Sequence, residues 1–246
     1  MGELTGRAAL VTGGGRGIGA AIARRLAAAG ADVAVTYVRG ADRARQVVRE
    51  VEAAGRRGLA LPADSADPAQ VTGAVTAAAA AFGRLDILVN NAGIAPYGPL
   101  EEVRAEEVDQ VLAVHVRAAF VAAQAAARHL GPGGRIINIG SSLAERVPDP
   151  GWTLYATSKS ALLGLTRGLA RDLGPRGITV NVVQPGSTDT EMNPADSPGA
   201  DHERSLTALG RYARPDDIAS MVAHLAGPGG DYVTGAAIAV DGGFAA

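Results

Sequence analysis

The feature that most constrains the fold is an alternation that runs along the whole chain. Short apolar runs rich in Val and Ile are separated by longer Ala-rich stretches whose polar residues fall at helical spacing. The seven runs are AALVTGG (8–14), DVAVTYV (32–38), GLALPAD (58–64), LDILVNNAG (85–93), GRIINIGSS (134–142), GITVNVVQPG (177–186) and AAIAVDGG (236–243). Because the runs are apolar on both faces and a helix candidate separates nearly every pair, they predict a doubly wound α/β fold, with a parallel sheet covered by helices on both faces.

The length and the continuity of the pattern predict one domain over residues 1–246. With 246 residues and 47% hydrophobic content, the chain can bury a core, and no change of composition or Pro/Ser-rich linker divides it. The Ala-rich stretch 71–82 resembles low-complexity sequence. It follows Pro68 and leads into a strand, so we interpret it as a helix rather than a linker.

Charge and composition exclude several classes of function. A net charge of −2 and a pI near 6.1 provide no field that attracts nucleic acid or an anionic membrane. The absence of cysteine excludes disulfides, thiolate metal sites and a cysteine nucleophile, and no histidine pair has metal-ligand spacing. No run is long enough to span a membrane, and the first residues do not resemble a signal peptide. We therefore expect a cytoplasmic protein without a nucleic-acid partner, a membrane partner or a metal.

A glycine-rich turn follows the first predicted strand and precedes a predicted helix. The segment TGGGRGIG covers residues 12–19. Glycines at its turn positions allow a sharp bend, a close approach of the backbone to a pyrophosphate, and a helix start whose amides face the anion. A tight structural turn is the alternative, but the strand–turn–helix placement favours a Rossmann-type dinucleotide site. The candidate cofactor residues here are Gly13, Gly15, Arg16, Gly17, Ile18 and Gly19.

Motifs spread over essentially the whole chain resemble those of the short-chain dehydrogenase/reductase family. They are the G-x-x-x-G-x-G turn, Asn90-Asn91-Ala92-Gly93 after the fourth run, Ser142 thirteen residues before Tyr155, Tyr155-x-x-x-Lys159, and Pro185-Gly186 after the sixth run. Within the family the chain resembles 3-oxoacyl-carrier-protein reductases. The stretches DSAD (64–67), GPRGITVNVVQPG (174–186) and DTEMNPADSP (189–198) also resemble a bacterial subset associated with cyclic di-GMP and biofilm dispersal.

Lys159 is the only lysine among the 23 basic residues, and it lies four residues after Tyr155. Residues i and i+4 share one face of a helix, so an ammonium there can lie near the phenol and reach a bound ribose. A nearby cation favours the phenolate of tyrosine, whose reference pKa is about 10. Arginine does not reproduce a compact, rotatable ammonium. The alternative is a solvated helix lysine beside a packing tyrosine. We predict catalytic roles for both residues.

Ser142 is the candidate that holds a substrate carbonyl while Tyr155 delivers a proton and a nicotinamide delivers hydride. It ends the fifth run, at the edge of the sheet where open α/β folds bind ligands. Ser141 competes for this role, and the choice of Ser142 depends only on the thirteen-residue offset found in the family. A Ser-His-Asp hydrolase is the other interpretation of an exposed serine, but the chain has no G-x-S-x-G elbow.

Charge at the end of the second run predicts that NADP(H) is preferred over NAD(H). NAD-binding folds usually carry a carboxylate there, whereas an NADP 2′-phosphate requires arginine. This chain has Arg39, with no carboxylate before Asp42, and Arg16 is a second cation in the glycine turn. Either arginine is alternatively a solvated surface residue. The family resemblance also implies cofactor contacts by Asp64, Ser65, Asn91, Ala92, Gly93, Tyr155, Lys159, Pro185, Gly186 and Thr188.

One position departs from the family pattern. The resemblance implies an asparagine that completes a catalytic tetrad, and the segment VDQVLAVHVRAAF places His115 there. Three interpretations remain open. The resemblance implies a backbone carbonyl at this position that holds a water on a relay to Lys159, and a histidine can preserve that role. Alternatively, the histidine joins the relay through its own ring, or it is a buried residue that is only hydrogen-bonded.

Residues 187–210 are the candidate substrate lid, a polar stretch with no clear strand and at most a short helix. Its side chains do not identify a substrate, and the small-molecule carbonyl compound that we expect as substrate follows from the family resemblance. The family resemblance also implies a homotetramer. Two hypotheses on function therefore stand. The chain is an NADPH-dependent carbonyl reductase, or it is a ligand-binding or regulatory protein on the same fold, for example one that sequesters cyclic di-GMP.

Overall fold

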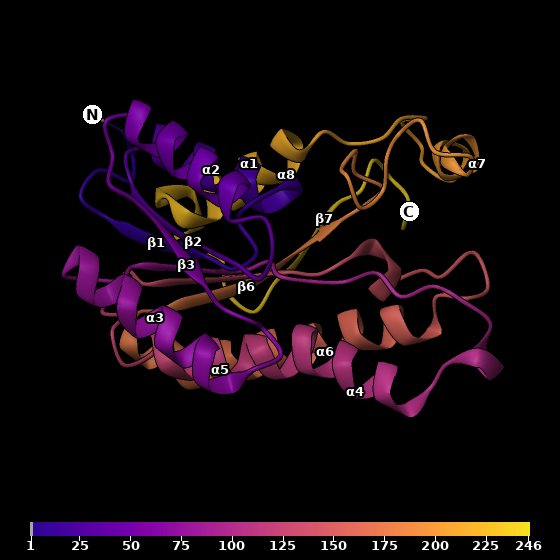
Figure 1. The fold of residues 1–246 in the computed structure, drawn as a ribbon, viewed down its shortest axis with the longest axis horizontal. Helices are drawn as coiled ribbons and strands as arrows, with labels where there is room; N and C mark the ends of the chain where they lie inside the picture. The colour runs from indigo at the N-terminus through magenta and orange to yellow at the C-terminus, as the bar shows by residue number, and fades with distance from the viewer. Residues whose placement is uncertain (1) are drawn as a thin grey trace.

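The computed structural model describes residues 2–246 and contains one seven-stranded sheet (Figure 1). All neighbouring strands are parallel, in the order β3-β2-β1-β4-β5-β6-β7. The strands are β1 (Ala8–Val11), β2 (Asp32–Tyr37), β3 (Gly58–Pro62), β4 (Ile87–Asn90), β5 (Arg135–Ile139), β6 (Thr179–Pro185) and β7 (Ala237–Val240). The predicted doubly wound α/β fold is confirmed. The strands are shorter than the apolar runs because each run includes the turn that follows its strand.

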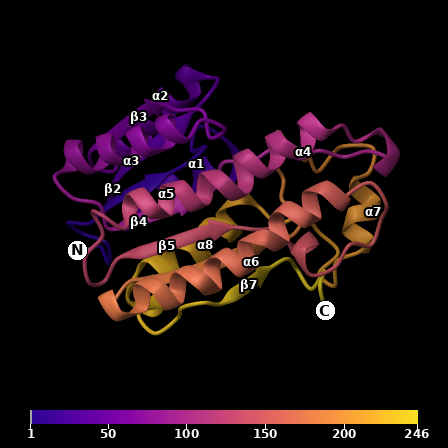
Figure 2. The ribbon, with the colours of Figure 1, turned by 90° about the horizontal axis from the view of Figure 1, so that it is seen from below.

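Helices cover both faces of this sheet (Figures 1 and 2). One face carries α1, α2 and α8, and the other carries α3, α5 and α6. The α-helices are α1 (Gly17–Ala28), α2 (Ala41–Ala53), α3 (Pro68–Phe82), α4 (Ala105–Leu112), α5 (Ala118–Ala126), α6 (Thr153–Leu173), α7 (Ala200–Ser205) and α8 (Pro215–Ala226). None of the helices within residues 2–246 is long and apolar enough to cross a membrane.

The two faces of the sheet bury separate apolar layers. Ile22 of α1, Val47 of α2 and Ile218 of α8 pack on one side, while Val75 of α3 and Ala122 of α5 pack on the other. The many buried alanines allow helices to lie close to the sheet, and the β-branched strand residues fill the space between them. This packing holds the strand ends, and therefore the loops that leave them, in fixed positions.

The strand order reverses between β1 and β4. Chain direction along the sheet changes at this point, and open α/β sheets bind ligands in the crevice it creates. The glycine turn follows β1 and the loop 91–99 follows β4, so both leave the sheet at the same edge. β5 and β6 also end at that edge, so the loops that follow Ile139 and Pro185 lie at the crevice.

Two helices differ from the sequence prediction, one in where it begins and the other in its continuity. The Ala-rich stretch 71–82 is helical, as α3. That helix starts at Pro68 because the Asp67 side chain accepts hydrogen bonds from the backbone N–H groups of Ala69 and Gln70, at 2.8 and 3.3 Å. The helix after β4 is interrupted by a π-helical turn over Ala113–Arg117, between α4 and α5. Such turns often occur at functional sites, and this one contains His115.

Candidate active site

The glycine turn after β1 leaves no room for a side chain at Gly13 or at Gly19. Gly13 has a left-handed φ of 64°, and a Cβ there would lie 2.9 Å from the Ala92 Cα. A Cβ at Gly19 would lie 2.5 Å from the Gly13 carbonyl oxygen. Gly17 begins α1 with a φ of 51°, so the free amides of the first helical turn face the crevice. This is a cradle shaped for close backbone approach to an anion, and Gly15 and Ile18 lie within it.

Thr12 and Asn91 fix the cradle to the loop after β4. The Thr12 hydroxyl oxygen accepts from the backbone N–H groups of Asn91 and Ala92, at 3.0 and 3.1 Å. The Asn91 side-chain amide donates to the carbonyl oxygens of Thr12 and Gly13, at 3.0 and 3.1 Å. The Asn91 side-chain amide therefore joins the loop after β4 to the glycine turn. Because these bonds occupy the amide, we expect the loop to contact a ligand through its backbone groups.

Two arginines converge near the end of β2 on one carboxylate. Arg43 Nη1 donates to Glu191 Oε2 at 2.6 Å, and Arg16 Nη1 donates to the same oxygen at 3.3 Å. Gly40, with a φ of 76°, precedes α2, and a Cβ there would lie 2.9 Å from Arg43 Nε. Arg43 therefore folds back toward the strand end. Arg39 is exposed in the same turn.

Sequence reasoning named Arg16 and Arg39 but missed Arg43. The left-handed turn at Gly40 brings the Arg43 guanidinium back toward the end of β2. The only sequence signal was an arginine three residues after a glycine at the start of a predicted helix, which is common on solvated surfaces.

Ser141, rather than Ser142, lies against Tyr155. A hydrogen bond from the Ser141 hydroxyl to the phenol oxygen lowers the pKa of Tyr155, and the same serine oxygen accepts from the Leu143 backbone N–H at 3.2 Å. Ser141 is the last extended residue, with φ −165° and ψ 148°, and Ser142 begins the 3-10 helix Ser142–Ala144. The choice of Ser142 from the thirteen-residue offset is corrected, because the chain turns at Ser142 and leaves the preceding serine facing the phenol.

Burial dominates the protonation of Tyr155. It raises the pKa of the phenol, and the hydrogen bond to Ser141 opposes that rise. The Lys159 ammonium lies 5.6 Å from the centre of the phenol ring. Burial therefore outweighs the lowering of the Tyr155 pKa expected from this cation, and the phenol carries its proton around neutral pH.

An aromatic row extends from Tyr155 toward solvent. The Trp152 ring lies 5.7 Å from the Tyr155 ring, and the exposed Tyr97 ring lies 4.9 Å from Trp152, both measured between ring centroids. Tyr97 and Trp152 therefore form one wall beside the phenol, apolar on its face and polar at its rim.

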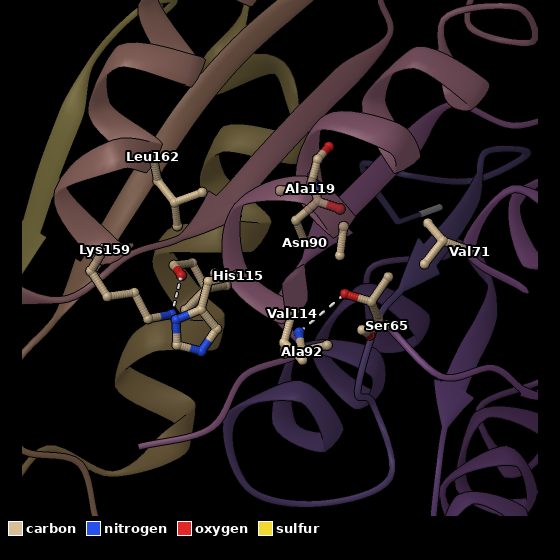
Figure 3. Close-up of a pocket in the computed structure, with 12 residues that line it drawn as sticks. Ser65, Val71, Asn90, Ala92, Val114, His115, Ala119, Lys159 and Leu162 are labelled. Atoms are coloured by element: carbon tan, nitrogen blue, oxygen red, sulfur yellow. Dashed lines mark hydrogen bonds between the residues drawn. The ribbon is translucent and has the colours of Figure 1, made fainter. Parts of the chain in front are cut away.

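Lys159 is buried, with 5% of its surface exposed. Its ammonium donates to the Ile139 carbonyl oxygen at 3.0 Å, at the end of β5 (Figure 3). Burial lowers the pKa of Lys159 to about 8. The alternative of a solvated helix lysine is wrong. Its position on α6, one turn after Tyr155, directs the ammonium into the crevice.

The His115 ring is neutral, and both its nitrogens are hydrogen-bonded. Nε2 accepts from the Ile94 backbone N–H at 2.9 Å, so Nδ1 carries the proton and donates to the Ser158 hydroxyl at 2.8 Å. That hydroxyl donates to the Tyr155 carbonyl oxygen at 2.7 Å. Burial, followed by the charge of Lys159, lowers the pKa of His115 to about 3. The structure supports the buried, hydrogen-bonded interpretation, since the ring has no free nitrogen to relay protons.

A small cavity adjoins Lys159 and His115 (Figure 3). Its volume is about 20 Å³, enough for one water molecule. Figure 3 shows Lys159 and His115 on one side of this space, with Ser65 and Ala92 on another. The remaining lining residues are Thr12, Val71, Asn90, Val114, Ala118, Ala119, Ile139 and Leu162.

The other predicted cofactor residues lie at the same edge of the sheet. Asp64 and Ser65 follow β3, whereas Pro185 ends β6 and Gly186 and Thr188 follow it. The Thr188 hydroxyl is buried and donates to the Gly186 carbonyl oxygen at 2.9 Å. A Cβ at Gly186 would lie 2.7 Å from backbone of the loop after β7, so only glycine fits there.

The segment 187–210 spans the crevice. Near its start, Thr190 and Asn193 exchange backbone hydrogen bonds of 3.3 and 3.1 Å in a tight turn, with Glu191 between them. Farther along, α7 lies at the end of the molecule away from the N-terminus (Figure 2). There His202 Nε2 lies 2.9 Å from an Asp149 carboxylate oxygen in the loop after β5. The segment therefore contacts both the glycine turn and the far wall of the crevice.

The crevice offers phosphate-binding backbone, cations and a proton donor, but no metal ligands. Among residues 2–246, no three or more His, Cys, Asp or Glu side chains are grouped so that they could hold a metal ion. A phenol and a buried ammonium beside a nucleotide cradle are suited to proton transfer coupled to hydride transfer from a bound nucleotide.

Comparison with known proteins agrees with this fold. Residues 13–245 match the family model described as enoyl-(acyl carrier protein) reductase. A short-chain dehydrogenase from Burkholderia cenocepacia, solved in complex with NADP, is 60% identical with a TM-score of 0.98, covering 99% of this chain and 100% of that one. The chain belongs to the short-chain dehydrogenase/reductase family.

Two curated relatives differ in what their names describe. The cyclic-di-GMP-binding biofilm dispersal mediator protein of Escherichia coli is 47% identical over 246 residues, which is 100% of both chains. The hydroxynaphthalene reductase of Aspergillus fumigatus is 41% identical over 246 residues, covering 94% of this chain and 90% of the relative. The relatives of this chain therefore include one named as a reductase and one named for cyclic di-GMP binding and biofilm dispersal.

Proposed function

We propose that the chain is an NADPH-dependent oxidoreductase that reduces a ketone to a secondary alcohol, with Tyr155 as the proton donor. The observation that carries this proposal is the pairing of a protonated phenol with a buried ammonium one helical turn away, at the crevice beside the glycine cradle. The similarity to a dehydrogenase that binds NADP and to a hydroxynaphthalene reductase supports it.

The residues present fit a nicotinamide dinucleotide. A Cβ at Gly13 or Gly19 would collide with the loop after β4 or with the turn itself, so only glycine allows this tight turn into α1, whose first backbone amides suit a diphosphate. Arg16, Arg39 and Arg43 supply cations for a 2′-phosphate. The loops after β3, β4 and β6 would hold the adenosine and the nicotinamide. The bound cofactor would supply the hydride.

The protonation states favour reduction. Because burial raises the pKa of Tyr155, the phenol holds a proton that it can donate to a carbonyl oxygen as that oxygen gains charge. Lys159, whose pKa is about 8, then returns a proton to the phenolate more readily than an ordinary lysine would. His115 orients this pair through Ser158 and keeps its own proton.

Ser141 is the residue we assign to the substrate carbonyl. Its hydroxyl contacts the Tyr155 hydroxyl, so a carbonyl oxygen that binds one can bind the other. Ser141→Ala and Ser142→Ala form a matched pair, both small changes at buried serines. We expect Ser141→Ala to reduce kcat about a hundredfold, as loss of one oxyanion donor does, and Ser142→Ala to change it less than about threefold.

The test of the proposed activity is NADPH oxidation, followed by absorbance, against a panel of ketones, aromatic ketones and β-ketoacyl thioesters. Turnover that is abolished by Tyr155→Phe, while NADPH binding persists, supports the proposal. Absence of turnover with every ketone class, or turnover that survives Tyr155→Phe, contradicts it.

The second candidate function is binding of cyclic di-GMP with little turnover. The similarity to the Escherichia coli biofilm dispersal protein favours it, and the arginines around the glycine cradle would suit its phosphates. Calorimetry with cyclic di-GMP tests it. Tight binding together with no ketone turnover supports this function over reduction, and no heat of binding contradicts it.

The chain is also proposed to form a homotetramer. β7 is an edge strand of the sheet, and Ala237 and Ala239 on it are exposed, so an apolar face is available for a second copy. Sedimentation equilibrium at micromolar concentration tests the assembly. A mass of four chains supports it, and a mass near 24.7 kDa, the mass of one chain, contradicts it.

A further inference from the structure

The Glu191 carboxylate binds the two arginines that we propose for the 2′-phosphate of NADPH. Its Oε2 accepts from Arg43 at 2.6 Å and from Arg16 at 3.3 Å, near the end of β2 where a ribose 2′-phosphate is expected. A single carboxylate oxygen shared by two guanidinium groups resembles the contact that a phosphate oxygen makes with an arginine pair.

The geometry points to Glu191 as a residue that sets the preference between NADPH and NADH, because it competes with the 2′-phosphate for Arg16 and Arg43. This inference rests on the proposed use of a nicotinamide cofactor. NADH carries no group that needs these two arginines, so competition by Glu191 affects only the phosphorylated cofactor.

The position of Glu191 allows the exchange. It lies at the tip of the Thr190–Asn193 turn, whose backbone hydrogen bonds do not involve the Glu191 side chain. The side chains of Glu191, Arg16 and Arg43 are 53%, 49% and 51% exposed. The carboxylate can therefore leave the arginines without unfolding the turn, and water solvates it when it does.

The same exchange is coupled to the segment 187–210. A Cβ at Gly17 would lie 3.3 Å from the Thr190 Cγ2, so the tip of the turn covers the start of α1. The Glu191 bonds tie that tip to the glycine turn. When a 2′-phosphate takes both arginines, the tip loses this tie, and the segment becomes freer on the side of the cradle.

The size of the effect follows from exposure. Two exposed ion pairs hold the carboxylate weakly, so Glu191 is bound to the arginines for only part of the time. The apparent NADPH affinity is reduced in proportion to the fraction of molecules in which Glu191 occupies them. Removal of the Glu191 charge should tighten NADPH binding about three- to tenfold and leave NADH within about twofold.

The experiment measures the dissociation constants of NADPH and NADH, by calorimetry, for the wild type, Glu191→Gln and Asp201→Asn. Asp201→Asn is the matched control, because it removes one carboxylate from the same segment, and Asp201 forms an ion pair with Arg204 on its own helix. We expect Glu191→Gln to tighten NADPH alone and Asp201→Asn to change neither. An unchanged or smaller ratio of NADH to NADPH dissociation constants in Glu191→Gln overturns the inference.

A second readout follows the segment itself. Hydrogen exchange of the amides of residues 189–193 should rise when adenosine 2′,5′-bisphosphate is added to the wild type, and should not respond to AMP. Protection of these amides by the bisphosphate would overturn the exchange. If the wild type binds neither NADPH nor NADH, the proposed function fails as well; if it binds NADPH and Glu191→Gln behaves as wild type, only the role of Glu191 fails.

Discussion

The two ends of the crevice are built from different chemistry. At the substrate end, Lys159 and His115 are at most 5% exposed, and their nitrogens are hydrogen-bonded to Ile139, Ile94 and Ser158. At the end where we propose that the adenosine binds, called the adenosine end, Arg16, Arg43 and Glu191 are about half exposed and form ion pairs at the surface. Burial at the first end fixes protonation states. Exposure at the second leaves charges that ligands can exchange.

The difference shows which property each end controls. Buried groups have shifted pKa values, and their geometry is costly to disturb, so they suit proton transfer. Exposed charges respond to ionic strength and to competing anions, so they suit the choice between similar cofactors. Changes at the substrate end should therefore alter kcat and pH dependence, and changes at the adenosine end should alter cofactor affinity.

The largest expected effect is that of Lys159→Arg. The planar guanidinium cannot take the buried position of the ammonium, so we expect kcat to fall about a hundredfold with the fold intact by circular dichroism. The wild type should also lose activity as pH rises through about 8, where Lys159 gives up its proton, and the variant should lose this limb. Arg171→Lys, near the end of the same helix, is the control. Wild-type kcat in Lys159→Arg would show that the lysine has no catalytic role.

At the adenosine end, Arg16→Ala combined with Arg43→Ala should raise the NADPH dissociation constant about tenfold, because two charge-assisted contacts to the phosphate are lost at an exposed site. The NADH constant should change less than about twofold. Added salt should reduce the difference, since it screens exposed charges. Arg45→Ala on α2 is the matched control. Equal losses for both cofactors would contradict the division between the two ends.

His115 predicts a pH dependence of stability. Its pKa is about 3 in the folded chain, below its ordinary value of 6.5, so the unfolded chain binds more protons between these values. The stabilisation is fully present above pH 6.5 and is lost as pH falls toward 3. Relative to His115→Asn, the wild type should lose on the order of 1–2 kcal/mol of unfolding free energy between pH 7 and pH 5. An equal change in unfolding free energy between pH 7 and pH 5 for the wild type and His115→Asn would disprove the buried neutral ring.

Replacement of Lys159 by methionine tests the cost of burying the ammonium. The folded chain lowers the pKa of Lys159 from 10.5 to about 8, so the wild type becomes more stable as pH rises from 8 to 10.5. Lys159→Met lacks this dependence and should be more stable than the wild type at pH 7, and the difference in unfolding free energy should shift toward the wild type by roughly 3 kcal/mol between pH 7 and pH 10.5. Urea denaturation at the two pH values measures it. A variant less stable than the wild type at pH 7 would show that the bond to Ile139 outweighs the cost of burying the charge.

The fold and the main site motifs follow from local sequence. Seven apolar runs separated by helical stretches predict the sheet, because each run must be buried on both faces. The positions of the glycine turn and of the Tyr155–Lys159 pair can be predicted because each motif lies within one short stretch of sequence. These features depend on residues close together in the chain, where spacing determines geometry.

The remaining features depend on the turns and on distant contacts. Ser141 replaces Ser142 because the chain enters a 3-10 helix one residue after the strand-end turn, which an offset cannot show. Arg43 meets Glu191 across 148 positions of sequence. The tautomer of His115 depends on Ile94 and on a π-helical turn that no residue pattern announces.

The most direct test of the account is the transfer of deuterium from NADPH labelled at the nicotinamide C4 to a ketone of the panel. We predict that the wild type places deuterium on the carbinol carbon of the product alcohol, and that Tyr155→Phe, with NADPH still bound, gives no labelled alcohol. NADPH that is consumed without label in the alcohol, or labelled alcohol formed equally by Tyr155→Phe, would contradict the claim that this crevice reduces a carbonyl with Tyr155 as its proton donor.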